Sequence, residues 1–338
     1  MRIGVAGAGR IGSMHATNLA SLEQVDQVLL HDPLPGRAAA VAAGLPRTTA
    51  VDSFPDLLTA CDGVLLATPT STHPDLLRAT TAAGVPALCE KPIAAGEAQM
   101  RALVADVEAT GTEVVVGFQR RFDPATAELH RRLRAGEVGR VYLVRALGND
   151  AVPPDPGYLP ASGGLFRDLL IHDLDAVPWL VGEPVTEVYA SGSVLVDEVF
   201  AATDDVDNAV ALLTFAGGAH ALLAGGRHDP AGYDHRIEVF GSRDCLAVGV
   251  DERTPLTSLE PGGRAPDDPY PGFPERFRRA YLAEVATFVD VAAGRAANPS
   301  PPRDSLVSLR LAEACERSRR TGAPVRLVEE PVGARSAR

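Results

Sequence analysis

RIGVAGAGRIG, residues 2–12, decides the fold of the first part of this chain. A short apolar run over residues 2–6 leads directly into a Gly-x-Gly-x-x-Gly turn, and a segment of helical character follows over residues 12–21. Asp32 lies 20 residues beyond Gly12, at the end of the next strand-like run. This order of strand, glycine turn, helix, strand and acid is typical of a dinucleotide-binding βαβ unit.

Each part of this motif has a chemical role. Glycines let the backbone approach a pyrophosphate, and the first turn of the helix offers unpaired N–H groups and a favourable dipole. The Asp32 carboxylate can accept hydrogen bonds from ribose hydroxyls and repels a 2′-phosphate, so NAD is favoured over NADP. Arg10 and Arg37 could soften that preference. The residues expected to bind the cofactor on this basis are Gly7, Gly9, Arg10, Ile11, Gly12 and Asp32.

Strand and helix signals alternate along the first 118 residues. Short buried strands separated by helices predict an α/β fold with a doubly wound parallel sheet. The expected strands are residues 2–6, 25–30, 62–67, 85–89 and 113–118, and the expected helices are residues 12–21, 36–43, 74–83 and 96–110.

The pattern changes after Arg121, where strand-like runs follow one another without intervening helices. This predicts an α+β domain with a large open sheet, mixed or antiparallel. Its expected strands are residues 140–146, 185–193, 207–215, 219–224, 236–240 and 325–328, and its helices residues 125–135, 166–181, 275–292 and 305–320. We therefore expect a cofactor domain over residues 1–120, a substrate and oligomerisation domain over 121–330, and a disordered tail over 331–338.

The composition of the 338 residues narrows the class of protein. A net charge of −12 argues against nucleic acid or an anionic membrane as the main partner. The four cysteines are far apart, so neither a zinc site nor a disulfide framework is predicted. The apolar run before the glycine turn is too short for the apolar region of a signal peptide, and the apolar stretch over residues 209–226 is interrupted by glycines. A cytoplasmic protein without a membrane span or a metal is expected.

Lys91 is the only lysine among 32 basic residues. It stands in Glu90-Lys91-Pro92 at the end of one predicted strand, and Thr68-Pro69 ends the preceding strand. Ligands of such sheets bind at the carboxyl ends of the strands, so Lys91 is expected where a nicotinamide and a substrate meet. A compact ammonium is not replaceable by a planar guanidinium. The alternative is an exposed lysine that happens to precede a proline.

Asp168, His172 and Asp175 are spaced i, i+4, i+7, which places them on one face of a predicted helix. A carboxylate one turn from an imidazole orients it and raises its basicity, as a general base requires. Two plainer interpretations remain open, a solvated helix face or a core histidine. A metal site is a further alternative, but this segment contains only one imidazole, which argues against it.

Taken together, these motifs resemble the Gfo/Idh/MocA oxidoreductases, and within them the inositol 2-dehydrogenases. The resemblance runs from Arg2 to about Phe288 and rests on GAGRIG, EKP, QRRFD, SGGLFRDLLIHDLDAVPWL and YDHRIEVFG. It implies an amino-terminal Rossmann domain and a carboxyl-terminal domain whose open sheet supports a homo-oligomer, a dimer or a tetramer. It also implies a cis bond between Lys91 and Pro92.

The resemblance further implies roles for particular residues. Catalysis is assigned to Lys91, Asp168 and His172. Further cofactor contacts are assigned to Thr68, Pro69, His73, Glu90 and Lys91. Substrate contacts are assigned to Lys91, Arg121, Asn149, Asp168, His172, Asp175 and Tyr233. Two departures bear on the exact polyol, the segment Asn149-Asp150-Ala151 and the proline at position 178.

The expected reaction is NAD-dependent oxidation of a secondary ring hydroxyl of a cyclitol or sugar, with myo-inositol or scyllo-inositol as the first candidates. Three other functions stay open at this point. They are a pyranose or amino-sugar dehydrogenase, a glycosidase that oxidises its substrate transiently with a retained NAD, and a non-catalytic NAD binder.

Overall fold

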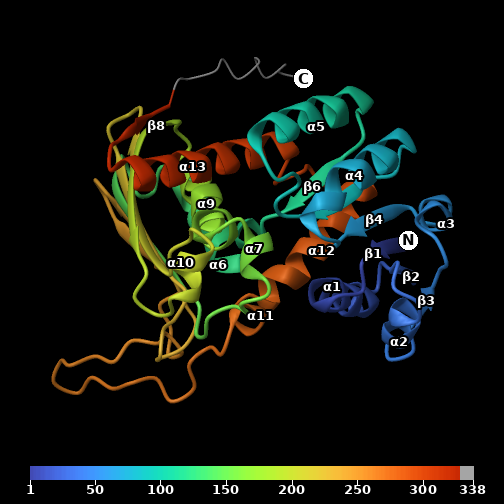
Figure 1. The fold of residues 1–338 in the computed structure, drawn as a ribbon, viewed down its shortest axis with the longest axis horizontal. Helices are drawn as coiled ribbons and strands as arrows, with labels where there is room; N and C mark the ends of the chain where they lie inside the picture. Colours follow the sequence, from blue (N-terminus) through green and yellow to red (C-terminus); the bar gives the residue numbers. More distant parts are fainter. Residues whose placement is uncertain (328–338) are drawn as a thin grey trace. The chain divides into compact units, whose positions relative to one another are not determined.

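The computed structural model describes residues 1–327 and divides the chain into two compact units (Figure 1). The first unit comprises Met1–Pro124 and Phe277–Leu309, and the second comprises Ala125–Arg276 and, within the described residues, 310–327. The sequence predicted two consecutive domains. It did not predict that the chain returns to the first unit after the second has begun. The tail expected over residues 331–338, and the end of the strand expected at residue 328, lie outside the described residues.

The first unit contains a parallel sheet in the order β3-β2-β1-β4-β5-β6, six strands within the described residues. The order reverses between β1 and β4, so the doubly wound sheet predicted from the sequence is confirmed. The strands are β1 (Arg2–Ala6), β2 (Gln27–His31), β3 (Thr48–Ala50), β4 (Gly63–Leu66), β5 (Ala87–Glu90) and β6 (Val114–Gly117). β3 was not predicted because three residues at a sheet edge give almost no hydrophobic signal.

The helices of the first unit follow the strands along the chain. They are α1 (Arg10–Ser21), α2 (Arg37–Ala42), α3 (Phe54–Ala60), α4 (His73–Ala82), α5 (Glu97–Thr110) and α12 (Arg278–Ala292), with short 3₁₀ turns η1 (Thr70–Thr72) and η2 (Gln119–Phe122). The apolar face of α12, with Val285, Phe288 and Val289, joins the core formed by β1, β2 and α1. This burial explains why a segment so late in the sequence belongs to the first unit.

The returning chain also covers the open edge of the first sheet. The Val116 N–H donates to the carbonyl of Ser300 at 2.8 Å, and Asn298 Nδ2 donates to the Val114 carbonyl at 2.7 Å. Backbone groups of the edge strand β6 therefore find partners without a further strand.

The second unit contains a mixed sheet in the order β12-β11-β7-β10-β9-β8-β13, seven strands within residues 1–327. Only the β7–β10 pair among them is parallel. The strands are β7 (Val141–Asn149), β8 (Val185–Ser193), β9 (Asn208–Phe215), β10 (His220–Gly226), β11 (Asp234–Gly241), β12 (Cys245–Val248) and β13 (Val325–Arg326). The predicted α+β sheet is confirmed, and the short edge strand β12 was not foreseen.

Helices pack on one face of this second sheet and leave the other face open. Side chains of α9 and α13, including Leu174, Val177 and Leu311, share one core with the strands. On the opposite face Tyr189, Val210, Leu212 and Leu222 are exposed. The helices are α6 (Pro124–Arg134), α7 (Leu159–Ser162), α8 (Leu165–Asp168), α9 (Ile171–Val181), α10 (Val199–Ala202), α11 (Phe273–Arg276) and α13 (Pro302–Thr321).

The helix expected over residues 166–181 is interrupted, which corrects the prediction that its polar residues share one regular face. The Leu165 carbonyl accepts from the N–H groups of both Leu169 and Leu170 at 3.0 Å, so the turn widens by one residue. α8 ends at Asp168 and α9 begins at Ile171. Asp168 therefore does not stand one regular turn before His172.

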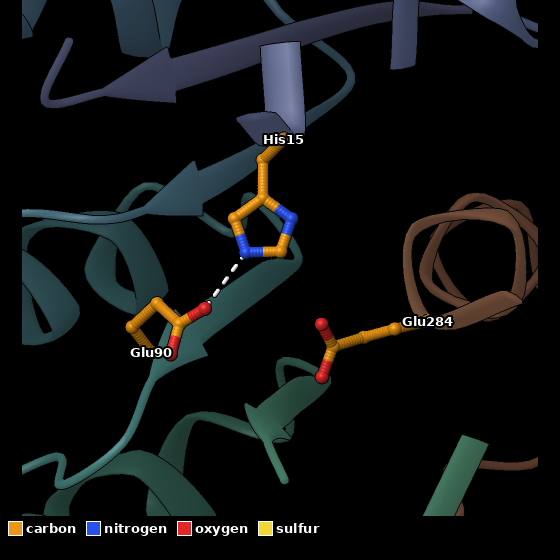
Figure 2. A group of neighbouring side chains, drawn as sticks. All are labelled: His15, Glu90 and Glu284. Carbon is orange, nitrogen blue, oxygen red and sulfur yellow. Dashed lines mark hydrogen bonds and ion pairs between the residues drawn. The ribbon is translucent and has the colours of Figure 1, made fainter. Parts of the chain in front are cut away.

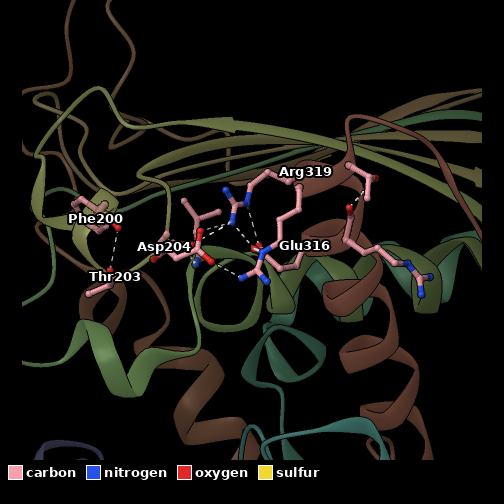
Figure 3. A network of polar contacts seen from close by, with 10 residues as sticks. Phe200, Thr203, Asp204, Glu316 and Arg319 are labelled. Carbon is pink, nitrogen blue, oxygen red and sulfur yellow. Dashed lines mark hydrogen bonds and ion pairs between the residues drawn. The ribbon is translucent and has the colours of Figure 1, made fainter.

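An ion-pair network fastens the end of α13 to the turn after α10 (Figure 3). Arg319 contacts Glu316 and Asp204, and Arg320 Nη2 lies 2.7 Å from Asp204 Oδ2. The Thr203 hydroxyl donates to the Phe200 carbonyl within that turn. Because the Asp204 side chain is 72% exposed, we expect these pairs to contribute no more than about 1 kcal/mol each.

No helix among the described residues combines the length and the apolar character that a membrane span requires.

Candidate active site

The three glycines of the first turn have different roles. Gly7 and Gly12 are required by the backbone geometry, whereas Gly9 leaves open space next to the turn. Gly7 has a φ of +97°, and a Cβ on Gly12 would lie 1.9 Å from the Gly7 carbonyl oxygen. A Cβ on Gly9, by contrast, would meet nothing within 4 Å. α1 starts directly after Gly9, which has no side chain to cap it. This open cradle at a helix N-terminus fits a dinucleotide pyrophosphate.

Asp32 is held against the same turn. Its Oδ2 accepts from the Ala8 N–H at 2.8 Å, and its Oδ1 accepts from the Leu34 N–H at 2.9 Å. Arg37 Nη1 lies 3.7 Å from Oδ2 and partly balances the charge. The carboxylate is thus fixed at the end of β2 and keeps lone pairs for ribose hydroxyls. The glycine turn and the fixed Asp32 carboxylate together fit NAD. The glycine turn alone would not distinguish this cofactor.

His73, predicted to contact the cofactor, uses both ring nitrogens on backbone carbonyls. Nδ1 lies 2.9 Å from the Pro92 oxygen, and Nε2 lies 2.9 Å from the Thr68 oxygen. Burial lowers the pKa of His73, and the two carbonyl contacts oppose that shift. A neutral imidazole carries one N–H, so His73 donates a hydrogen bond to one of these carbonyls and lies against the other, between the loops that follow β4 and β5.

Lys91 follows β5 directly, at the carboxyl edge of the sheet. Its bond to Pro92 is cis, which confirms the prediction made from the resemblance. The neighbouring β4 ends before Thr68 and Pro69, so the two predicted loops lie on adjacent strands. Lys91 is half-buried, which argues against a fully solvated lysine. Beside it, Glu90 Oε1 lies 2.7 Å from His15 Nε2.

In the second unit, polar groups gather where β7 and β10 end and β11 begins. Asn149 lies opposite both Gly226 and Asp234 in the sheet register. Asn149 Nδ2 contacts Asp229 Oδ2 at 3.4 Å, and the buried Tyr233 precedes β11. These positions bring two predicted substrate residues to one edge of the second sheet.

Asp168 is anchored at that edge by a residue that the sequence did not single out. Arg227 Nη1 lies 2.9 Å from Asp168 Oδ2 and 3.3 Å from Asp150 Oδ2. Tyr158 donates its hydroxyl hydrogen to Asp168 Oδ1 at 2.9 Å. Burial works against the charge of Arg227, but the two carboxylates outweigh it and raise the pKa of the guanidinium. Asp168 is therefore held as an ionised acceptor.

His172 and Asp175 both lie on α9, three residues apart. His172 is half-buried in the first turn, and Asp175 is buried one turn later. Between them Asp173 is fully buried, with Oδ1 3.8 Å from His235 Nε2. An imidazole and a carboxylate on one helix remain able to move a proton and to bind a hydroxyl.

Arg121 has contacts that favour an anchoring role over substrate binding. Its Nη1 donates to Asp304 Oδ2 at 2.7 Å and to the Pro299 carbonyl at 3.0 Å, and its side chain is 3% exposed. These bonds fasten η2 to the returning segment of the first unit.

Local patterns offered little sign of Arg227, His15 or Glu284, each of which is buried in a polar cluster. Arg227 follows a strand directly, and this position at a strand end was the one available signal. His15 and Glu284 approach each other from segments 269 residues apart, a separation no local pattern reveals.

Comparisons with known proteins agree with this geometry. Residues 1–118 match an oxidoreductase family model with an NAD-binding Rossmann fold, and residues 126–247 match the GFO/IDH/MocA C-terminal domain. A myo-inositol dehydrogenase of Streptomyces leeuwenhoekii is 39% identical over 95% of this chain and 98% of its own. A scyllo-inositol 2-dehydrogenase (NAD⁺) of Bacillus subtilis is 33% identical over 97% of this chain and 96% of its own.

Among solved structures, a myo-inositol dehydrogenase from Corynebacterium glutamicum superposes with a TM-score of 0.89, at 34% identity, over 98% of this chain and 99% of that one. The likeness therefore extends through both units in sequence and in fold. The chain belongs to the Gfo/Idh/MocA family of oxidoreductases and carries that family's NAD-binding Rossmann domain.

Proposed function

We propose that this protein oxidises one secondary ring hydroxyl of an inositol to a ketone, with myo-inositol as the preferred substrate. The observation that carries the proposal is the 39% identity, over nearly the full length of both chains, to a myo-inositol dehydrogenase. The open glycine turn and the fixed Asp32 supply a site of the matching cofactor type.

The cofactor contributes one chemical property, since bound NAD accepts the hydride that leaves the carbinol carbon. All other steps fall to side chains of the protein. The glycine turn and the N-terminus of α1 hold the pyrophosphate, and Asp32 accepts from the adenosine ribose.

We assign proton removal to His172 and stabilisation of the developing alkoxide to Lys91. The ammonium donates a hydrogen bond to the reacting oxygen, where it favours the charged form over the neutral alcohol. Asp168, fixed by Arg227 and Tyr158, serves as an ionised acceptor for a substrate hydroxyl or for the imidazole. Asp175, Asn149 and Tyr233 are assigned to the remaining hydroxyls.

A substrate panel tests this function. Purified protein is mixed with myo-inositol, scyllo-inositol and D-chiro-inositol, and separately with aldoses and amino sugars, with either NAD or NADP. We expect nicotinamide reduction with an inositol and NAD at the highest kcat/KM. A higher kcat/KM with NADP would contradict the role of Asp32, and a higher value with an aldose would move the substrate class to pyranoses.

A chromogenic glycoside in the same panel separates dehydrogenase from glycosidase. Release of the aglycone without net reduction of added NAD would identify a hydrolase that recycles a retained cofactor. If no compound of the panel reacts but NAD binding is measurable, the result would favour a non-catalytic NAD binder.

We also propose that the open face of the second sheet binds a second copy of the chain. Tyr189, Val210, Leu212 and Leu222 are exposed on that face, and Leu212 lies opposite both Tyr189 and Leu222 in the register. A contiguous apolar surface of this kind is unusual on a monomer. Light scattering after chromatography should give a dimer or tetramer, and Leu222→Arg should lower the mass. A monomeric wild-type protein would contradict this.

A further inference from the structure

Three ionisable side chains from distant segments of the first unit converge behind the Glu90-Lys91-Pro92 loop (Figure 2). His15 lies on α1, Glu90 ends β5, and Glu284 points toward both from α12. One nitrogen or oxygen atom of each lies within 4.8 Å of the other two. His15 and Glu284 are fully buried, and the Glu90 side chain is 15% exposed.

Two of these residues are already paired. His15 Nε2 lies 2.7 Å from Glu90 Oε1. An ionised carboxylate can only accept hydrogen bonds, so Nε2 must carry the hydrogen and donate it. The rings of His15 and Tyr281 also form a T-shaped pair, with centroids 5.7 Å apart. The imidazole is thus fixed between α12 and the end of β5.

Glu284 differs because neither of its carboxylate oxygens has a hydrogen-bond partner within residues 1–327. An ionised carboxylate that is buried without a partner costs several kcal/mol, and a second carboxylate nearby adds repulsion. Burial raises the pKa of Glu284 well above its usual range, and the charge of Glu90 raises it further. Both effects favour the neutral acid.

Among residues 1–327, no cationic side chain pairs with Glu284. α1 presents His15 and β5 presents Glu90, while α12 itself adds Tyr281. η2, which packs on α12, carries Arg120 and Arg121. The Arg120 guanidinium lies 5.8 Å from the centre of the Phe277 ring, and Arg121 pairs with Asp304.

We propose that Glu284 carries a proton and acts as a positioning residue, which together with His15 holds Glu90, and through it Lys91, at the carboxyl end of β5. The neutral acid can donate its hydrogen to a Glu90 oxygen after a small side-chain rotation, so repulsion between two carboxylates becomes attraction. Glu90 then accepts a hydrogen bond from each of these two neighbours. This inference rests on the proposed role of Lys91.

A divalent cation on the same three side chains is the competing explanation. Two ligands on one ion, with bonds of about 2.1 Å and tetrahedral angles, lie about 3.4 Å apart. The 2.7 Å between His15 and Glu90 is shorter than that and is the length of a hydrogen bond. The geometry therefore favours a proton over an ion.

Thermal unfolding of the cofactor-free protein tests the proton directly. Glu284→Gln is compared with the wild type from about pH 5 to about pH 8. In the wild type the folded state keeps a proton that the unfolded chain releases above its ordinary pKa of 4.5, so stability is full below that pH and is lost as pH rises toward the folded pKa. Glutamine has no such loss, so the Tm of Glu284→Gln minus that of the wild type should increase with pH.

Glu23→Gln is the matched control, since it makes the same change at an exposed glutamate of the first unit. Its Tm difference should not follow pH in this way. A Tm difference for Glu284→Gln that is flat across the range, or that falls with pH, would overturn the proposal. So would loss of stability on chelation that is restored by zinc, which would identify a cation.

Kinetics then separate positioning from simple packing. Glu284→Gln should keep kcat/KM within about threefold of the wild type, whereas Glu284→Leu, which cannot donate, should lower kcat by about tenfold or more while staying folded. Equal losses in both variants would contradict the role of the shared hydrogen. If no inositol is oxidised by the wild type, the proposed function fails, but the unfolding experiment still decides the protonation of Glu284.

Discussion

Arg227 Nη1 lies 2.9 Å from Asp168 Oδ2, and the guanidinium side chain is only 2% exposed. The pair joins the residue after β10 to the end of α8, and Asp150 completes it from the end of β7. A carboxylate proposed to serve the reaction is thus held by a buried cation that lies far along the chain from it.

Replacing Arg227 with methionine should leave Asp168 and Asp150 without their cation. We expect a loss of about 3 kcal/mol in the free energy of unfolding, measured by denaturant titration, because one partner of a buried ion pair is removed. The double variant Arg227→Met, Asp168→Asn should recover part of that loss. Arg303→Met, which breaks an exposed ion pair, is the control and should change stability by less than about 1 kcal/mol.

The glycines of the first turn should respond differently to alanine. Gly12→Ala places a Cβ against the Gly7 carbonyl and should destabilise the fold by about 3 kcal/mol. Gly9→Ala meets open space, so its Tm without cofactor should match the wild type, while its Kd for NAD rises at least about tenfold. Unchanged NAD binding in a folded Gly9→Ala protein would show that the cofactor does not use this cradle.

The free energy of unfolding should depend on pH through His73. Because burial lowers its pKa below the ordinary value of 6.5, its contribution is present above that pH and is lost as pH falls through the folded pKa. His73→Gln should therefore be less stable than the wild type by about 1–2 kcal/mol at about pH 8, with a smaller difference near pH 5. His228→Gln, at an exposed histidine, should show no such trend. A constant difference for His73→Gln would contradict the assignment.

Lys91→Arg keeps the charge but replaces the compact ammonium with a planar group. We expect kcat with inositol and NAD to fall about 100-fold or more, with little change in Tm. Lys91→Met should be no more active than Lys91→Arg. Turnover close to that of the wild type in Lys91→Arg would remove Lys91 from the chemistry.

Local patterns were sufficient for β1, β2, β4, β5 and β6 of the first sheet because these strands are short, buried apolar runs. They failed at β3 and β12, which are edge strands of three and four residues with little buried surface. They also failed at Leu169 and Leu170, where one carbonyl accepts two N–H groups and breaks a helix whose spacing looked regular.

In the candidate site, too, local patterns identified some residues and missed those that depend on contacts between distant segments. Gly9, Asp32 and Lys91 were found because each stands at a strand end or helix start that the sequence marks. Arg227 and Glu284 were not found, because their importance lies in charges brought from far along the chain. The roles of His73 and Arg121 were implied by the resemblance and stay predictions, and in the structure both side chains contact backbone carbonyl oxygens.

Transfer of deuterium tests the central claim most directly. myo-Inositol with deuterium on every ring carbon is incubated with the wild-type protein and NAD, and the nicotinamide and the cyclitol are analysed by mass spectrometry. The proposed function predicts one deuterium in each reduced nicotinamide and an equal amount of an inosose that has lost one. Absence of deuterium from the nicotinamide, with the cyclitol recovered unchanged, would contradict it.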